Sequence, residues 1–238
     1  MKRLLLISIA ILSIASCTNE DAENNMHLTG SVKGLKKGTL LLQKVIDSTF
    51  QTIDSLQVNG TGDFEFNSII ESPEVYYLSL KTQTQKQPEK NIPFFAEAGE
   101  MTINTSLLAF NRDSKITGSV NEDKFREYRK LMQRYADKNL ELTEAQVNAY
   151  QEGNMKLFDS INGQQKRVLS SKYLATVNYA LNNKDYEIAP FLALTEIYDV
   201  NVKYLDTIYT TMTPKIKDSK YGIVLESFIK DIKKIESN

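Results

Sequence analysis

Two chemically reactive residue types occur only once in this chain of 238 residues, as Cys17 and His27. A single cysteine cannot form a disulfide within the chain, so redox chemistry that uses an intrachain pair of thiols is excluded. A single histidine excludes a metal site built from several histidines, and a histidine-dependent triad would rest on His27 alone. His27 opens a predicted strand on the face opposite Leu28, where we expect an exposed side chain without a catalytic role.

The remaining candidates for chemistry are carboxylates and a glycine pair near predicted turns. Asp47, Asp54, Glu97 and Glu100 lie closest to strand ends, and a glycoside hydrolase needs two carboxylates at a defined separation. The alternative is that all four are solvated turn and edge charges. The segment 60–62 (Gly-Thr-Gly) could be taken for a phosphate loop, but such a loop feeds a helix, and strand-like alternation follows here. We therefore expect no catalytic residue, no metal site and no cofactor, and a protein that is not an enzyme.

The amino terminus has the order of parts of an export signal. Basic residues at positions 2 and 3 precede the apolar run 4–14, and Ala15 and Ser16 precede Cys17. A membrane-spanning helix needs about 20 apolar residues, so this run is too short to be one. The stretch 14–17 resembles the lipobox of bacterial lipoproteins, which implies a signal peptide at 1–16 and acylation of Cys17. The alternative is an ordinary signal peptide with a cysteine at its cleavage point.

Residues 17–25 are expected to form the lipidated cysteine and a polar, disordered tether. The acidic pair Glu20 and Asp21 resembles the surface-export signal of Bacteroidetes lipoproteins, and a plain solvated spacer is the alternative. The prediction is a cell-envelope protein, attached to the outer membrane through a lipid anchor, on its periplasmic or its surface face.

The charge balance bears on the class of partner. The chain has 29 basic and 30 acidic residues, and removal of Lys2 and Arg3 with the signal peptide leaves a formal charge of 27 − 30 = −3. No excess of basic residues marks a nucleic-acid interface, so we expect no nucleic-acid partner.

The first half of the body alternates apolar and polar residues in short segments between turn residues, which is typical of strands. Glycine or asparagine at 59–62 and 98–99 predicts hairpin turns. Strands are expected at 27–32, 39–46, 49–58, 63–69, 74–81, 92–97, 100–104 and 115–118. So many short strands in some ninety residues favour two packed sheets.

After residue 120 the period changes to that of helices. Asn121 is predicted to cap the first helix, and Thr143 with Gln146 forms a capping-box pattern that predicts the start of a second. Further helical stripes run over 157–181, 191–198, 205–212 and 221–235. The predicted fold is α+β, an N-terminal antiparallel β-sandwich (26–120) followed by a C-terminal all-helical region (121–238).

Aromatic residues supply the candidate binding surfaces. Tyr76 and Tyr77 are adjacent on one predicted strand, so one of them must face away from the core and could form a binding surface. The alternative is an edge or interdomain contact. Phe228 lies in the apolar stripe of the last helix, which could dock a partner or could close its own bundle.

The first half resembles the DUF4369 domain of Bacteroidetes envelope proteins. The likeness rests on spacing and turn residues, notably Gly30, Gly34, Gly38, Asp54, Gly62, Phe64, Phe66, Phe94, Glu97, Gly99 and Gly118. In relatives this domain and a helical segment precede a thioredoxin-like domain of the peroxiredoxin or TlpA kind. The sequence ends about where that domain would begin. The disulfide reductase activity of longer relatives is therefore not expected to carry over to this protein.

The function expected from the sequence is that of a non-enzymatic cell-envelope lipoprotein acting as a binding or interaction module. The alternative is an accessory or scaffold subunit for a separate thioredoxin-like envelope protein. The first expectation requires a concave or aromatic-lined surface, and the second requires an exposed apolar patch near the last helix.

Overall fold

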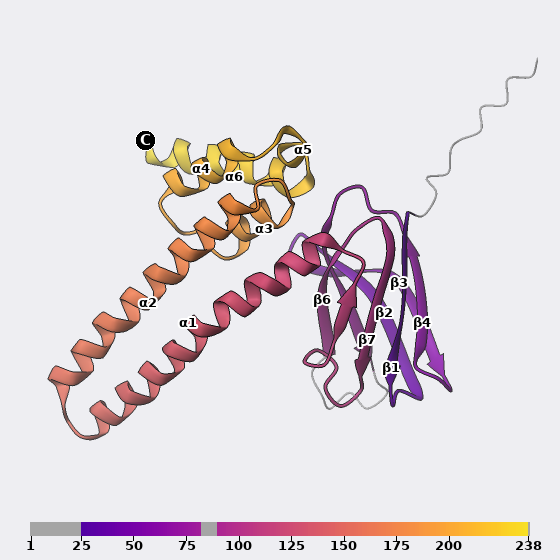
Figure 1. The fold of residues 1–238 in the computed structure, drawn as a ribbon, viewed down its shortest axis with the longest axis horizontal. Coiled ribbons are helices and arrows are strands. Elements are labelled where there is room, and N and C mark those ends of the chain that lie inside the picture. The colour runs from indigo at the N-terminus through magenta and orange to yellow at the C-terminus, as the bar shows by residue number, and fades with distance from the viewer. Residues whose placement is uncertain (1–24, 82–89, 238) are drawn as a thin grey trace, which may run out of the picture.

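A computed structural model describes residues 25–81 and 90–237. It confirms the predicted α+β fold, because eight strands form two sheets and six helices follow them in the described part of the chain (Figure 1). The predicted signal peptide, Cys17 and most of the tether lie outside the described residues.

The two sheets have four strands each, in the orders β4-β1-β7-β8 and β3-β2-β5-β6. The strands are β1 Met26–Lys33, β2 Lys37–Ile46, β3 Thr49–Asn59, β4 Asp63–Ser68, β5 Glu74–Lys81, β6 Lys90–Ala96, β7 Gly99–Ser106 and β8 Lys115–Thr117. We call the sheet β4-β1-β7-β8 the first sheet and the sheet β3-β2-β5-β6 the second sheet.

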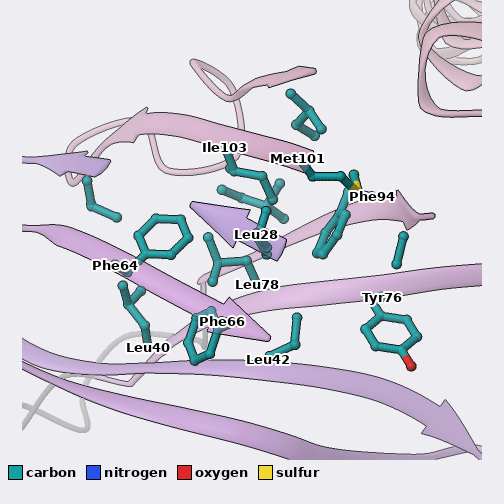
Figure 2. Close-up of a cluster of buried hydrophobic side chains, with 14 of the residues drawn as sticks. Leu28, Leu40, Leu42, Phe64, Phe66, Tyr76, Leu78, Phe94, Met101 and Ile103 are labelled. Atoms are coloured by element: carbon teal, nitrogen blue, oxygen red, sulfur yellow. The ribbon is translucent and has the colours of Figure 1, made fainter. Parts of the chain in front are cut away.

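The core of the sandwich follows from residue alternation. Along β4, Phe64 and Phe66 are buried while Asp63 and Glu65 are exposed. Successive side chains of a strand point to opposite faces, so this pattern puts one face of the sheet in the core. Figure 2 shows side chains from both sheets meeting there, among them Leu28, Leu42 and Leu78.

One pair of strands departs from the predicted antiparallel arrangement. β1 pairs antiparallel with β4 on one side but parallel with β7 on the other. Gly30 permits this pairing at close range, because a Cβ at that position would lie 1.9 Å from the carbonyl oxygen of Ile103 on β7.

Two turns predicted as hairpins instead cross between the sheets. The turn at 60–62 leads from β3 in the second sheet to β4 in the first, and the turn at 97–98 leads from β6 to β7 in the same sense. A genuine hairpin joins β2 to β3, where Asp47 and Ser48 both adopt positive φ. Turn residues predict a reversal of the chain, but they do not say which sheet receives the next strand.

The helices are α1 Val120–Gln151, α2 Met155–Asn182, α3 Ile188–Thr195, α4 Val202–Thr211, α5 Pro214–Lys217 and α6 Lys220–Glu236. α1 and α2 form a long antiparallel hairpin that extends away from the sandwich and from the layer of α3 to α6 (Figure 1). Among the described residues, no helix combines the length and the apolar character that a membrane crossing requires.

Two helix boundaries differ from prediction. α1 is continuous through Thr143, whose hydroxyl donates to the carbonyl of Asn139 one turn back instead of capping a new helix. The break comes at Gly153, which has a φ of +69°, and Asn154 then caps α2. At the start of α1 the cap is Ser119, which accepts from the backbone N–H of Glu122 at 2.9 Å, and not Asn121.

A second apolar core holds the helical layer together. α2, α3, α4 and α6 contribute Val177, Ala193, Leu205 and Leu225, all buried. The outer half of the hairpin lies beyond this core and has only a small cluster of its own around Leu142.

Candidate interaction site

The two candidate tyrosines lie on opposite faces of the second sheet. Tyr76 is 2% exposed within the sandwich core, so Tyr77 is the member of the pair that faces outward. Tyr77 points outward and packs edge-to-face on Phe50, with ring centroids 4.9 Å apart. Burial raises the pKa of Tyr77. Phe50 itself is largely exposed, so the aromatic pair forms a small apolar surface beside the helical layer.

Phe228, the third candidate, packs against the core of the helical layer and is partly buried. The exposed apolar residues of α6 are Ile223 and Val224, and Ile235 at the end of the same stripe as Phe228. The stripe that contains Phe228 therefore mainly closes its own bundle, and the exposed Ile223 and Val224 lie beside it.

Among the candidate carboxylates, Glu97 lies at a helix cap and Asp54 lies within β3. Glu97 accepts hydrogen bonds from the Ser119 hydroxyl at 3.0 Å and from the backbone N–H groups of Val120 and Asn121, so it stabilises the start of α1. Asp54 accepts from the N–H of Ser55. In residues 25–81 and 90–237, no group of three or more His, Cys, Asp or Glu is placed to hold a metal ion.

His27 lies on the outer face of the first sheet. Its Nδ1 is 2.8 Å from Asn67 Oδ1, and the carboxylates of Glu65 and Glu100 lie 3.7 and 4.0 Å from its ring nitrogens. The hydrogen bond to Asn67, with smaller contributions from the two carboxylates, raises the pKa of His27.

Asn121 is the centre of a polar network between sandwich and helices. Its amide nitrogen donates to Glu97 at 2.7 Å and to Glu187 at 2.8 Å, and its amide oxygen accepts from the N–H of Ile188 at 2.8 Å. One buried side chain thus ties the end of β6 to the start of α3. A buried amide with all these groups paired fixes the relative position of the elements that it joins.

Glu122 makes the second connection. It is 1% exposed, accepts from the N–H of Phe95 at 3.0 Å and forms an ion pair with Arg129 at 2.6 Å. Burial raises the pKa of Glu122, and the nearby Arg129 guanidinium opposes that shift. The backbone N–H of Phe95, on the edge strand β6, thereby finds its acceptor on α1.

Aromatic side chains surround these polar contacts. Phe95 on the outer face of the second sheet makes edge-to-face contacts with Phe125, Phe191 and Tyr221, which come from α1, α3 and α6. The Tyr221 hydroxyl accepts from the N–H of Val75 at 2.9 Å. The sandwich and the helical layer therefore share one packed junction, and this junction sets the direction in which the hairpin projects.

The seam of the hairpin has a heptad spacing with polar interruptions. On α1 the residues facing α2 follow steps of four and three: Tyr128, Met132, Tyr135, Asn139, Leu142, Gln146 and Ala149. Across the seam Gln146 bonds Asn162, and Gln165 donates to Thr143 at 3.3 Å. Polar residues at such positions fix the register of two helices but reduce their apolar packing.

Because the seam is poorly filled, a groove opens on each side of it. One groove, of about 650 Å³, is lined by apolar residues such as Met132, Ala136 and Leu169 and by polar residues such as Asn139 and Lys166. A second groove of about 490 Å³ opens on the other side. Both volumes are in the range of small-molecule and peptide-binding clefts.

Beyond the grooves the hairpin exposes large apolar side chains. Leu140 is 60% exposed, Val147 50% and Tyr150 67%, and Met155 and Leu157 are also exposed at its end. Clusters of exposed apolar side chains in a soluble body mark interaction surfaces more often than isolated ones do. The hairpin is therefore the candidate interaction site.

The sequence contained a signal for this site that our interpretation missed. Asn139, Gln146 and Gln165 occupy positions that the heptad reserves for apolar residues, and Leu140 and Val147 lie one residue outside the seam. The division of 121–151 into two segments at Thr143 concealed this regular spacing.

Comparison with known proteins concerns the first half of the chain. Residues 26–125 match the family described as a domain of unknown function, DUF4369, which confirms the DUF4369 likeness expected from the sequence. The match includes Asn121 and Glu122, the two residues that connect α1 to the sandwich. A search of curated proteins finds no match to the chain.

Proposed function

We propose that this protein is a non-enzymatic cell-envelope lipoprotein that acts as an interaction module, with the α1–α2 hairpin as its binding arm. The observation that carries the proposal is the hairpin itself, which projects from a fixed junction and has a groove of about 650 Å³ beside exposed Leu140 and Val147. An arm whose direction is fixed by its junction presents an apolar surface that is already formed before binding, which lowers the cost of ordering it.

Membrane attachment is a separate part of the proposal and rests on the lipobox-like residues 14–17 and on the likeness to Bacteroidetes envelope proteins. Cys17→Ala should abolish incorporation of a labelled fatty acid and release the protein from the membrane fraction. Retention of both label and membrane attachment would show that the anchor is wrongly assigned, without bearing on the hairpin.

The binding arm is tested by photo-crosslinking in the cell. A photoreactive amino acid at Leu140 or Val147 should give a discrete crosslinked product, whereas the same group at Glu65, exposed on the first sheet, should give none. Absence of any product from both hairpin positions would overturn the hairpin as binding arm.

A second candidate function is that of an accessory subunit for a thioredoxin-like envelope protein. The observation that favours it is the exposed pair Ile223 and Val224 on α6, near the end of the described chain. A crosslink from Ile223 to a thioredoxin-like protein, with none from Leu140, would replace the first proposal by this one.

A further inference from the structure

One side of α1 carries an apolar strip, which Glu144 interrupts between Leu140 and Val147. Met132, Ala136, Leu140 and Val147 are separated by four, four and seven residues on α1, so helical periodicity places them on one side. Leu169 of α2 joins Met132 and Ala136 in lining the groove. The strip runs from the groove toward the end of the hairpin.

The charges of the hairpin divide along its length. We define the stem as residues 129–139 and 165–174, and the tip as residues 140–164. The stem has seven basic residues against one acidic residue, Asp137, whereas the tip has four acidic residues against one basic residue, Lys156. The basic residues of the stem are Arg129, Lys130, Arg134, Lys138, Lys166, Arg167 and Lys172, and the acidic residues of the tip are Glu141, Glu144, Glu152 and Asp159.

Many of these charges are not used within the chain. In the described part of the structure, salt bridges engage Arg129, Lys138, Lys172 and Glu141. No salt bridge among the described residues involves Lys130, Arg134, Lys166 or Arg167 of the stem, or Glu144, Glu152 or Asp159 of the tip. A basic apolar stem and an acidic apolar tip complement each other in charge and in hydrophobicity, but one rigid hairpin cannot fold its tip onto its own stem.

A second copy of the chain satisfies this complementarity. About 24 Å separates Arg134 from Tyr150 along α1, at roughly 1.5 Å per residue. Two hairpins placed side by side in opposite directions, overlapping by this length, put each tip against the other stem. A twofold axis makes both contacts equivalent, as in most protein dimers. The hairpin projects clear of the sandwich, so the bodies lie at opposite ends of such a pair (Figure 1).

We propose that the hairpin binds the hairpin of a second copy of this chain in antiparallel orientation, forming a four-helix bundle in which each acidic tip lies on the basic stem of the other copy. The exposed strips with Leu140 and Val147 then form the new core. The inference rests on the proposed function, because it names the partner of the same binding arm.

The first test is the oligomeric state of the mature protein with Cys17→Ser, which excludes association through an acyl chain. Sedimentation equilibrium should detect a dimer whose dissociation constant increases with salt, because exposed charge pairs are screened. A tip variant, Glu144→Lys with Glu152→Lys and Asp159→Lys, should weaken the dimer by roughly tenfold or more, because symmetry counts each lost pair twice.

The second test uses complementary variants. In a stem variant, Lys130→Glu with Arg134→Glu, Lys166→Glu and Arg167→Glu, the dimer should also be lost. An equal mixture of the stem and tip variants should restore association as a heterodimer, because each tip then again faces a stem of opposite charge. Circular dichroism checks that both variants retain their helices, and restored association is itself evidence that they are folded.

The third test fixes the orientation. With Cys17→Ser the chain has no cysteine, so Ala136→Cys in one copy and Val147→Cys in the other can be joined by a short thiol crosslinker. A stem-to-tip product exceeding the tip-to-tip product of two Val147→Cys copies is expected. The reverse ratio would overturn the antiparallel arrangement.

The outcomes separate this inference from the proposed function. A protein that stays monomeric at high micromolar concentration, or a dimer that neither charge variant weakens, overturns the self-association. If Leu140 then still crosslinks to a different protein in the cell, the hairpin remains a binding arm with another partner. If it crosslinks to nothing, both proposals fail.

Discussion

Asn121→Ala is the substitution that tests the junction most directly. The asparagine side chain is 2% exposed and bonds three groups from two segments: Glu97 after β6, and both Glu187 and the N–H of Ile188 at the start of α3. Alanine keeps the helix, since it is the best helix former. The substitution therefore removes the connection without a separate effect on α1.

The expected loss can be worked out from the three contacts. An unpaired buried N–H at Ile188 costs about 1–3 kcal/mol, and a hydrogen bond to a charged group contributes about 1.5–3 kcal/mol. Glu97 is only half-buried, so water can replace its lost partner, whereas Glu187 is buried. The two contributions add up to a decrease in the free energy of unfolding of about 2.5–6 kcal/mol, at the upper end for a single substitution.

The assay is denaturation in urea, followed by circular dichroism and by tyrosine fluorescence because the chain has no tryptophan. Asn148→Ala on the same helix is the matched control. Asn148 is exposed, and its replacement should change the free energy of unfolding by less than about 0.5 kcal/mol. If Asn121→Ala cost less than about 1 kcal/mol, the network would not hold the junction and the fixed direction of the hairpin would lose its basis.

Three further predictions test the sandwich, the junction and the outer sheet face. Gly30→Ala should cost about 1–3 kcal/mol in thermal unfolding because its Cβ would overlap a β7 carbonyl, whereas Gly163→Ala in α2, with no atom nearer than 4.0 Å, should gain about 0.5–1 kcal/mol. Tyr221→Phe should cost about 1–2 kcal/mol in urea denaturation because a buried N–H of β5 loses its acceptor, and a cost near zero would mean that water replaces it. NMR titration of His27, the only histidine, should give a pKa above 6.5 that falls in Asn67→Ala. Because the folded pKa is the higher one, the stabilisation from His27 is complete below pH 6.5 and is lost as the pH rises through the folded value, and an unchanged pKa in the variant would refute the assigned cause.

Local patterns predicted the elements of the sandwich well. Alternation along 63–68 identified β4, because a half-buried strand must place every second residue in the core. The same patterns could not predict the parallel pairing of β1 with β7. That pairing depends on which sheet each strand joins, and no residue within β1 specifies it.

The details of the surface could not be predicted for a different reason. Adjacent tyrosines required one to face outward, but only the register of β5 with β2 and β6 decides that it is Tyr77. In the hairpin, Thr143 was taken as a cap because its type permits that role. Whether a threonine caps a helix or bonds its own preceding turn depends on the backbone around it, and here the helix continues.

The position at which the chain can be divided follows from the same contacts. The boundary predicted at residue 120 passes between Ser119, which caps α1, and Asn121, which joins Glu97 to Glu187. The DUF4369 match instead continues to residue 125 and so includes Glu122, the acceptor for the N–H of Phe95. A chain ending at 125 would keep both side chains but leave Asn121 without Glu187 and Phe95 without its partners on α3 and α6. The family match therefore includes the first turns of α1 together with the sandwich, although in the structure these turns begin the hairpin. A β domain that supplies both the cap and the anchor of a long helix can hold that helix outward even though its seam is partly polar.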